Sequence, residues 1–235
     1  MDQHARLIGP VVFFTGAGAS VGAGLPTYRG QGGLYDGTGV EPPNAADLEP
    51  DRLPGLWARF APRLRAREAS GPAPAHHAIA ALERQAPGEV VVVTQNVDGL
   101  HQAAGSTRVI ELHGSLGTMR CFGAGHSLAV VDARWGDDGV PQCPECGEPC
   151  RPNVVLFGEM LPRAAWEAGG EAIRDAATVV AVGTSASVQP AASLISAAAT
   201  AHSVRIWVNP RDEPPDGRWQ WLAGTADEEL ARLAW

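Results

Sequence analysis

The sequence has no long uninterrupted run of apolar residues. No stretch approaches the ~18 apolar residues that a membrane-spanning helix requires, and the opening Met-Asp-Gln-His-Ala-Arg lacks the apolar core of a secretory signal peptide. The sequence therefore predicts a soluble, cytoplasmic protein that binds no membrane. Its hydrophobic content of 45% over 235 residues suffices for one large domain, or for one domain with an insertion.

Cysteine and positive charge are also scarce. Three of the four cysteines lie close together, and in a cytosolic chain such clustering indicates a metal site rather than disulfides. The net charge of −8 argues against binding to nucleic acid and is compatible with a basic, lysine-bearing substrate.

A glycine-rich stretch near the start of the chain is the first motif with chemical meaning. The apolar residues Val11–Phe14 run into Gly16-Ala17-Gly18, as a buried parallel strand runs into a phosphate-binding helix. Glycine lacks a Cβ, so this backbone could approach a pyrophosphate closely. A tight turn explains the same residues, and Val21 stands where the third glycine of the dinucleotide fingerprint belongs.

Alternating helix and strand patterns predict an α/β fold. We expect strands at 89–94, 109–113, 178–182 and 204–208, and helices at 55–68, 75–85, 164–176 and 190–201. This rhythm indicates a doubly wound parallel sheet. Residues 30–56 fit no regular pattern and are either a loop that a cofactor orders or a plain surface connection. His76 and His77, before the apolar stripe of their helix, are interpreted as structural or solvated.

Further motifs follow in a fixed order along nearly the whole chain. They are Gly24-Leu25-Pro26-Thr27-Tyr28-Arg29-Gly30, Thr94–His101, Glu111–Gly114, Val155–Glu159, Gly183–Ser185 and Val208–Pro210. Together with the glycine-rich stretch, these blocks resemble those of the sirtuin family of NAD-dependent protein deacylases. Within that family the chain is most similar to bacterial, class III-like desuccinylase and demalonylase sirtuins.

The resemblance implies a domain organisation. Residues 1–35, 86–118 and 154–235 are expected to form a Rossmann-like core that binds NAD. A loop and helical module at 36–85 and a zinc-ribbon-like module at 119–153 would form the smaller domain.

The resemblance also implies roles for polar residues at the strand ends. His113 would be the general base that deprotonates a ribose hydroxyl, a task suited to imidazole because its pKa lies near neutrality, and Asn96 would assist catalysis. The NAD contacts would be Gly16, Ala17, Gly18, Ser20, Tyr28, Arg29, Gln95, Asn96, Asp98, Gly183, Thr184, Ser185 and Asn209. Without the resemblance, His113 could be a structural residue whose hydrogen bonds are satisfied within the fold, and Asn96 and Asp98 could be caps at the end of a strand. Tyr28 departs from the family, which usually has a phenylalanine that shields the reactive sugar carbon.

Substrate-binding residues are expected in two places. The strand predicted over Val154–Glu159 resembles the one that pairs with the substrate backbone, with Val155, Phe157 and Gly158 as contacts. In helix 55–68, Phe60 and Arg63 align with the Tyr-x-x-Arg pair by which class III sirtuins select acidic acyl groups. The alternative is that Arg63 belongs to a solvated face together with Arg59, Arg65 and Arg67.

The cysteine cluster departs from the family pattern. Cys143-Pro144-Glu145-Cys146-Gly147 is a zinc knuckle, and Cys121 begins a first pair whose partner position is Ala124. Three cysteines do not close a tetrahedral site. Either His126 or Cys150 could be the fourth ligand of a structural zinc, or the module binds no metal.

The activity these observations indicate is NAD-dependent removal of acyl groups from lysine in protein substrates, by a monomeric enzyme. Two alternatives use the same cofactor site: mono-ADP-ribosyl transfer or NAD hydrolysis, and non-catalytic sensing of NAD or ADP-ribose. A dehydrogenase is disfavoured, because the acidic residue expected about 20 residues after the glycines falls in an irregular loop.

Overall fold

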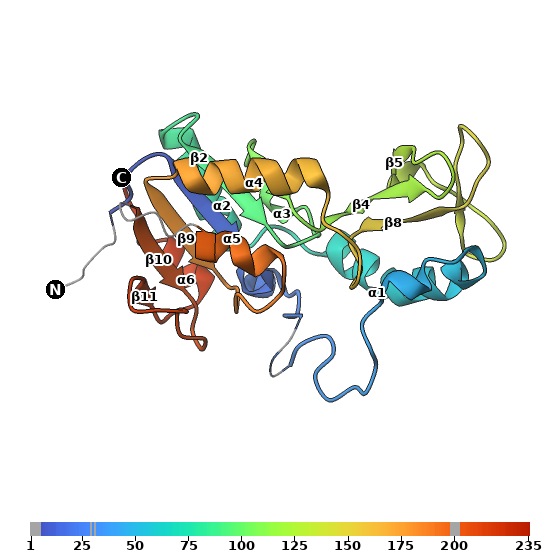
Figure 1. Cartoon of the computed structure of the whole chain (residues 1–235), viewed down its shortest axis with the longest axis horizontal. Coiled ribbons are helices and arrows are strands. Elements are labelled where there is room, and N and C mark those ends of the chain that lie inside the picture. Colours follow the sequence, from blue (N-terminus) through green and yellow to red (C-terminus); the bar gives the residue numbers. More distant parts are fainter. Residues whose placement is uncertain (1–5, 29, 31, 198–202) are drawn as a thin grey trace.

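Short apolar runs form the six parallel strands at the centre of the protein. The computed structural model describes residues 6–28, 30, 32–197 and 203–235. The strand order of the large sheet is β11-β10-β9-β1-β2-β3 (Figure 1). In that order the strands span Gln220–Leu222, Val204–Val208, Thr178–Val182, Val11–Thr15, Val90–Thr94 and Val109–Glu111. The central strands β1 and β9 are buried at every residue, so both faces of the sheet must be covered.

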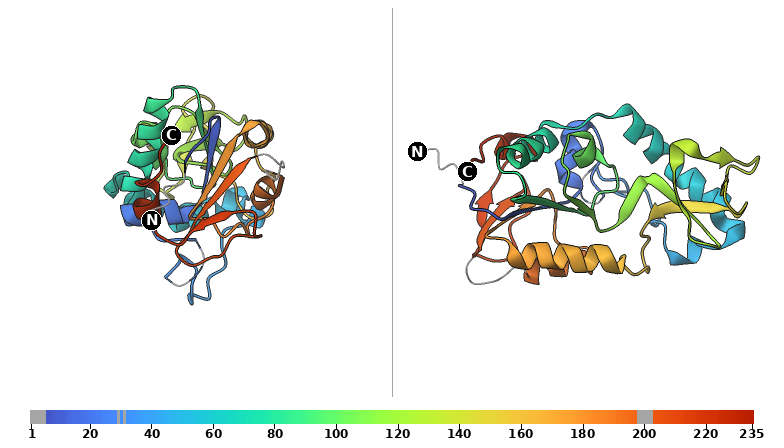
Figure 2. Two further views of the ribbon diagram at one scale, coloured as in Figure 1. Left: turned by 90° about the vertical axis from the view of Figure 1, so that its left-hand side faces the viewer. Right: turned by 90° about the horizontal axis from the view of Figure 1, so that it is seen from above.

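Helices cover the two faces of this sheet (Figure 2). One face carries α2 (Pro74–Gln85), α3 (Leu100–Ala103), α6 (Ala226–Leu230) and the short 3₁₀ helix η1 (Ala17–Ala23), and the other carries α4 (Arg163–Asp175) and α5 (Ala191–Ala197). Each layer has its own apolar core: Phe13 and Ile79 belong to the first and Phe14 and Ile173 to the second. Neighbouring residues of β1 therefore point into different cores, as the alternation of side chains along a strand requires.

A smaller module lies at the end of the molecule away from β10 and β11 (Figure 1). Its antiparallel sheet has the order β5-β4-β8, and α1 packs against β8, where the Trp57 indole N–H donates to the Cys150 carbonyl (2.7 Å). The module also contains a two-stranded sheet and three 3₁₀ turns. The bounds are α1 Leu53–Ala69, β4 Gly114–Cys121, β5 Ser127–Ala129, β6 Arg134–Trp135, β7 Pro141–Gln142, β8 Cys150–Val154, η2 Ala45–Asp47, η3 Pro50–Arg52 and η4 Val130–Asp132.

The predicted fold class, a doubly wound parallel sheet with a smaller domain, is confirmed. The strands expected at 178–182 and 204–208 have those bounds, and the expected helix at 55–68 is α1. The residue bounds proposed for the two modules stay a prediction; β4 begins at Gly114, before residue 119. In the part of the chain that the structure describes, no helix has the length and apolar character needed to cross a membrane.

Candidate functional site

A cavity of about 750 Å³ lies at the carboxyl edge of the large sheet. There β1 ends between β2 and β9, so the chain leaves β1 toward one side and later returns on the other. Open α/β sheets bind ligands at such a switch point. Predicted site residues that line the cavity are Gly16, Ala17, Gly18, Ser20, Tyr28, Phe60, Arg63, Gln95, Asn96, Asp98, His113, Val155, Phe157, Gly158, Gly183, Thr184 and Ser185.

Two predicted cofactor residues are not among the lining residues. The Asn209 side-chain amide lies behind Thr184 and donates to its carbonyl oxygen (3.1 Å). It thereby holds the turn after β9 that carries Thr184 and Ser185. Arg29 lies outside the described residues.

The glycines after β1 are required by backbone packing as well as by ligand access. A Cβ on Gly16 would lie 2.8 Å from the Gly183 carbonyl oxygen, and one on Gly18 would lie 2.6 Å from the Gly183 Cα. Gly183 itself has φ +58°, a conformation that favours glycine. The turns that follow β1 and β9 therefore meet backbone to backbone, and this contact forms one wall of the cavity.

His113 is held as a neutral imidazole with a free base nitrogen. Its Nδ1 lies 2.9 Å from the Gln95 carbonyl oxygen. A carbonyl only accepts, so Nδ1 carries the proton and Nε2 keeps its lone pair. Burial lowers the pKa of His113, while the hydrogen bond to Gln95 partly opposes that effect. Around neutral pH the side chain is therefore a proton acceptor.

A network of polar side chains joins the cavity wall to the buried His76 behind it. Ser20 Oγ donates to Asp98 Oδ2 (2.7 Å) and accepts from the Asn96 amide (3.1 Å). His76 Nδ1 accepts from the Ala73 N–H (3.1 Å), so its Nε2 carries the proton and faces Ser20 Oγ at 3.4 Å. Burial lowers the pKa of His76, which keeps the ring neutral. His76, interpreted as structural or solvated, is in fact fully buried and holds Ser20.

Sequence reasoning missed the apolar lining of the cavity and one arginine. The apolar residues include Leu25, Pro26, Leu34, Leu116, Leu156, Leu161, Val188 and Pro190. Arg67, which was grouped with the solvated arginines, lines the cavity and donates from Nε to the Asp98 carbonyl (2.8 Å). Its spacing of one helical turn from Arg63 is the signal that could have found it.

The strand predicted over Val154–Glu159 is wrong beyond its first residue, since β8 ends at Val154. The cause is the carboxylate of Glu159, which accepts from the Leu156 N–H (2.8 Å) and turns the chain back on itself. Arg151 reaches the same carboxylate with two N–H groups (2.7 and 2.8 Å). After β8 the segment makes only two strand-like backbone pairings among the described residues. The Val155 N–H donates to the His113 carbonyl, and Phe157 forms an isolated bridge with Asn44.

We expect Glu159→Gln to destabilise the protein strongly, because it leaves the guanidinium of Arg151, only 6% exposed, without its counterion. Breaking one partner of a buried pair costs about 3–5 kcal/mol. Burial alone would raise the pKa of Glu159, but the bonds from Arg151 and Leu156 bring it below the usual value. The pair therefore stabilises the fold above the carboxyl's ordinary pKa, and this contribution is lost as the pH falls.

The matched control is Glu167→Gln, which breaks the exposed pair of Glu167 with Arg163. At pH 7 the melting temperature should fall several times further for Glu159→Gln than for the control. The difference between the two variants should become smaller at acidic pH. Equal melting temperatures for the two variants would contradict this interpretation.

The cysteine-rich module brings four ligand atoms together. Those of Cys121, His126, Cys143 and Cys146 all lie within 4.8 Å of one another, with the Sγ atoms of Cys121 and Cys146 3.3 Å apart. A tetrahedral zinc with bonds of ~2.3 Å places its sulfur ligands roughly 3.8 Å apart. Three thiols and one imidazole at this spacing fit a closed structural zinc site, with His126 rather than Cys150 as the fourth member.

Fold and site together define a dinucleotide-binding α/β protein with a neutral histidine facing the cofactor cavity. The chain belongs to the Sir2 family, whose model matches residues 16–190. It is 40% identical over 210 residues to an NAD-dependent protein deacylase of Thermus thermophilus, covering 87% of this chain and 80% of that protein. It is 43% identical over 227 residues to NAD-dependent protein deacylase 2 of Pyrobaculum aerophilum, covering 94% and 88%.

Solved structures show the same relationship. A Sir2 protein in complex with deacetylated p53 peptide and 3′-O-acetyl ADP ribose superimposes with a TM-score of 0.84 at 29% identity. The match covers 94% of this chain and 91% of that one.

Proposed function

We propose that the protein is an NAD-dependent protein-lysine deacylase that releases nicotinamide and O-acyl-ADP-ribose. The observation that carries the proposal is the placement of His113, a neutral base, in the same cavity as the glycine-rich turn after β1. The family relationship and the relatives named as NAD-dependent protein deacylases support it.

Different residues of the cavity would have different roles in the reaction. Bound NAD would supply an activated sugar carbon and nicotinamide as the leaving group. Asn96 and Asp98, fixed through Ser20, would hold the nicotinamide end, and Thr184 and Ser185 the phosphates and adenosine ribose. His113 would accept a ribose hydroxyl proton at Nε2, because Nδ1 is already committed to Gln95.

The peptide side of the site is proposed at residues 155–158. Val155, Phe157 and Gly158 line the cavity beside His113, so a substrate backbone added along this segment would present its lysine to the cavity. The p53 peptide in the Sir2 complex supports a peptide substrate. Acylated proteins are thus the proposed partners of a monomer that binds neither nucleic acid nor membrane and acts in the cytoplasm.

One incubation tests the proposal: the protein with NAD and a panel of acyl-lysine peptides, with products identified by mass spectrometry. If the protein is a deacylase, the products should be deacylated lysine peptide, nicotinamide and O-acyl-ADP-ribose in equal amounts. The chain contains no lysine, so its own side chains add no background. Nicotinamide release with an intact acyl peptide would instead indicate ADP-ribosyl transfer or NAD hydrolysis, and no turnover would indicate a sensor.

We further propose that acidic acyl groups such as succinyl and malonyl are preferred. Arg63 is half-buried and lines the cavity, and no carboxylate among the described residues forms an ion pair with it. Phe60, 3% exposed, packs beneath it. A charge-assisted hydrogen bond to an acyl carboxylate would contribute roughly 1.5–3 kcal/mol.

Arg63→Met should therefore reverse the preference, so that acetyl peptide outperforms succinyl peptide in kcat/KM. Phe60→Tyr should sharpen the preference of the parent enzyme, because it adds one hydrogen-bonding hydroxyl. The matched control is Arg65→Met, since Arg65 is exposed on the same helix. A parent enzyme that prefers acetyl peptide, with no response to Arg63→Met, would place Arg63 with the solvated arginines.

A further inference from the structure

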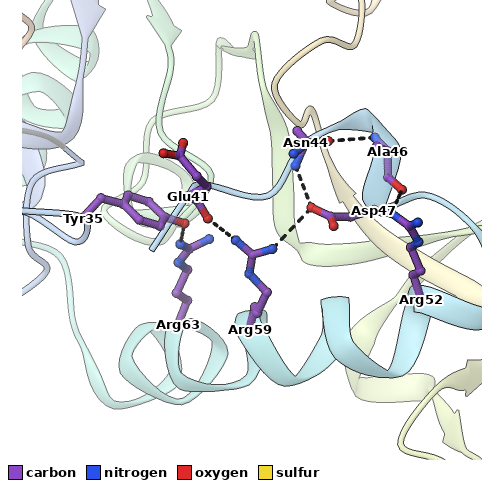
Figure 3. Close-up of polar contacts among 8 residues, drawn as sticks. All are labelled: Tyr35, Glu41, Asn44, Ala46, Asp47, Arg52, Arg59 and Arg63. Atoms are coloured by element: carbon purple, nitrogen blue, oxygen red, sulfur yellow. Dashed lines mark hydrogen bonds and ion pairs between the residues drawn. The ribbon is translucent and has the colours of Figure 1, made fainter. Parts of the chain in front are cut away.

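Arginines of α1 and the turn before it reach the loop that follows Gly30 (Figure 3). Arg52 donates to the Ala46 carbonyl (3.0 Å), and Arg59 contacts Asp47 (3.3 Å) and the Glu41 carbonyl. The third arginine, Arg63, donates to the Tyr35 hydroxyl. The loop at residues 35–47 is thus held along one side of the helix.

Arg63 differs from the other two arginines in where it lies and what it meets. It lines the cavity, whereas Arg52 and Arg59 do not. Its guanidinium carbon lies 5.0 Å from the Phe60 ring centroid and 5.4 Å from that of Tyr35. These are cation–π contacts, which orient the guanidinium without forming an ion pair with it.

The Tyr35 contact fixes one N–H edge of the guanidinium and leaves the others for a ligand. Arginine has five N–H donors in a rigid fork, and among the described contacts Arg63 uses one, toward Tyr35. A carboxylate accepts two parallel bonds from such a fork, and the attraction is strongest when the fork is already oriented. An unheld arginine would lose side-chain freedom on binding and so bind more weakly.

Aromatic contacts join Tyr35 to residues that line the cavity. Its ring lies 5.0 Å from that of Tyr28, and Tyr28 lies 5.9 Å from Phe157. Tyr28 and Phe157 both line the cavity. Tyr35 is therefore placed by packing against residues of the site, which keeps its hydroxyl in reach of Arg63.

We propose that Tyr35, delivered by the loop rather than by α1, is a positioning residue that holds Arg63 for the terminal carboxylate of an acidic acyl group. The hydroxyl that Phe60 lacks on the helix is in this way supplied from another segment. The proposal rests on the proposed function for its ligand. It concerns affinity for one class of acyl group and not the deacylation step.

The test is Tyr35→Phe, which keeps the ring and removes the hydroxyl. Affinities of succinyl-lysine and acetyl-lysine peptides are measured by calorimetry with ADP-ribose present, so that no turnover occurs. We expect the Kd of the succinyl peptide to rise roughly three- to tenfold, the effect of one lost hydrogen bond, with that of the acetyl peptide unchanged. In steady state the same variant should raise KM for succinyl peptide and leave kcat unchanged.

Two further variants separate positioning from general loosening of the loop. Arg59→Met removes another contact between α1 and the loop and should leave the succinyl Kd unchanged. When Tyr35→Phe is added to Arg63→Met, the succinyl Kd should not rise further, because Tyr35 acts only through Arg63. Three results would each overturn the proposal. Tyr35→Phe could weaken binding of the succinyl and acetyl peptides equally, or Arg59→Met could raise the succinyl Kd as much as Tyr35→Phe does. The effects of Tyr35→Phe and Arg63→Met on the succinyl Kd could also add in the double variant. Failure of the proposed function would show separately, as a parent enzyme that deacylates neither peptide.

Discussion

Replacing His113 with alanine is expected to lower kcat for deacylation by ~10²–10⁴-fold, the usual contribution of a general base. The cavity would keep its glycine-rich turn and its Ser20–Asp98 network, so NAD affinity and the melting temperature should stay near those of the parent. The matched control is His77→Ala, since His77 is exposed and does not line the cavity. Near-parent turnover by His113→Ala would remove His113 from the mechanism.

The pH profile gives an independent check on His113. Because burial lowers its pKa, the neutral base persists to more acidic pH than an ordinary histidine would. The acidic limb of the kcat profile should therefore lie below the usual histidine range of ~6.5 and should be absent from the residual rate of His113→Ala. An acidic limb above that range would contradict the burial argument.

Removal of the metal is expected to have the largest effect on stability. Zinc at Cys121, His126, Cys143 and Cys146 would cross-link the end of β4 to the turn before β8, in a module whose sheet, β5-β4-β8, has only three strands among the described residues. Elemental analysis should find about one zinc per chain in the parent and none in Cys143→Ser. Chelation should lower the melting temperature of the parent to that of the variant. A metal-free parent with an unchanged melting curve after chelation would contradict the site.

The fourth ligand can be assigned by two variants. His126→Ala should lose zinc, whereas Cys150→Ser should keep it, because Cys150 is not among the four clustered groups. Cobalt substitution provides a second measurement, since the thiolate-to-metal absorption reports how many sulfurs bind. Zinc retained by His126→Ala and lost by Cys150→Ser would reverse the assignment.

Most secondary structure followed from local patterns. The apolar runs at 178–182 and 204–208 became β9 and β10, and the order of the motifs placed the polar residues after β1, β2 and β9. These predictions succeeded because a strand buried on both faces is mostly apolar along its length, which is visible without the fold. The prediction for segment 154–159 failed because its turn depends on a polar contact, the Leu156 N–H to the Glu159 carboxylate, which Arg151 also holds and which the apolar pattern of the segment does not show.

The sequence by itself determined the α/β class, the family motifs and which polar residues meet at the carboxyl edge of the sheet, because these follow from side-chain periodicity and from motif order. Only the tertiary structure decided that Gly16 and Gly18 pack against Gly183, that His126 rather than Cys150 joins the cysteines, and that Tyr35 reaches Arg63. Each of these choices depends on distances between segments that are far apart along the chain. Such distances are set by how the layers and the smaller module pack, and no local pattern records them.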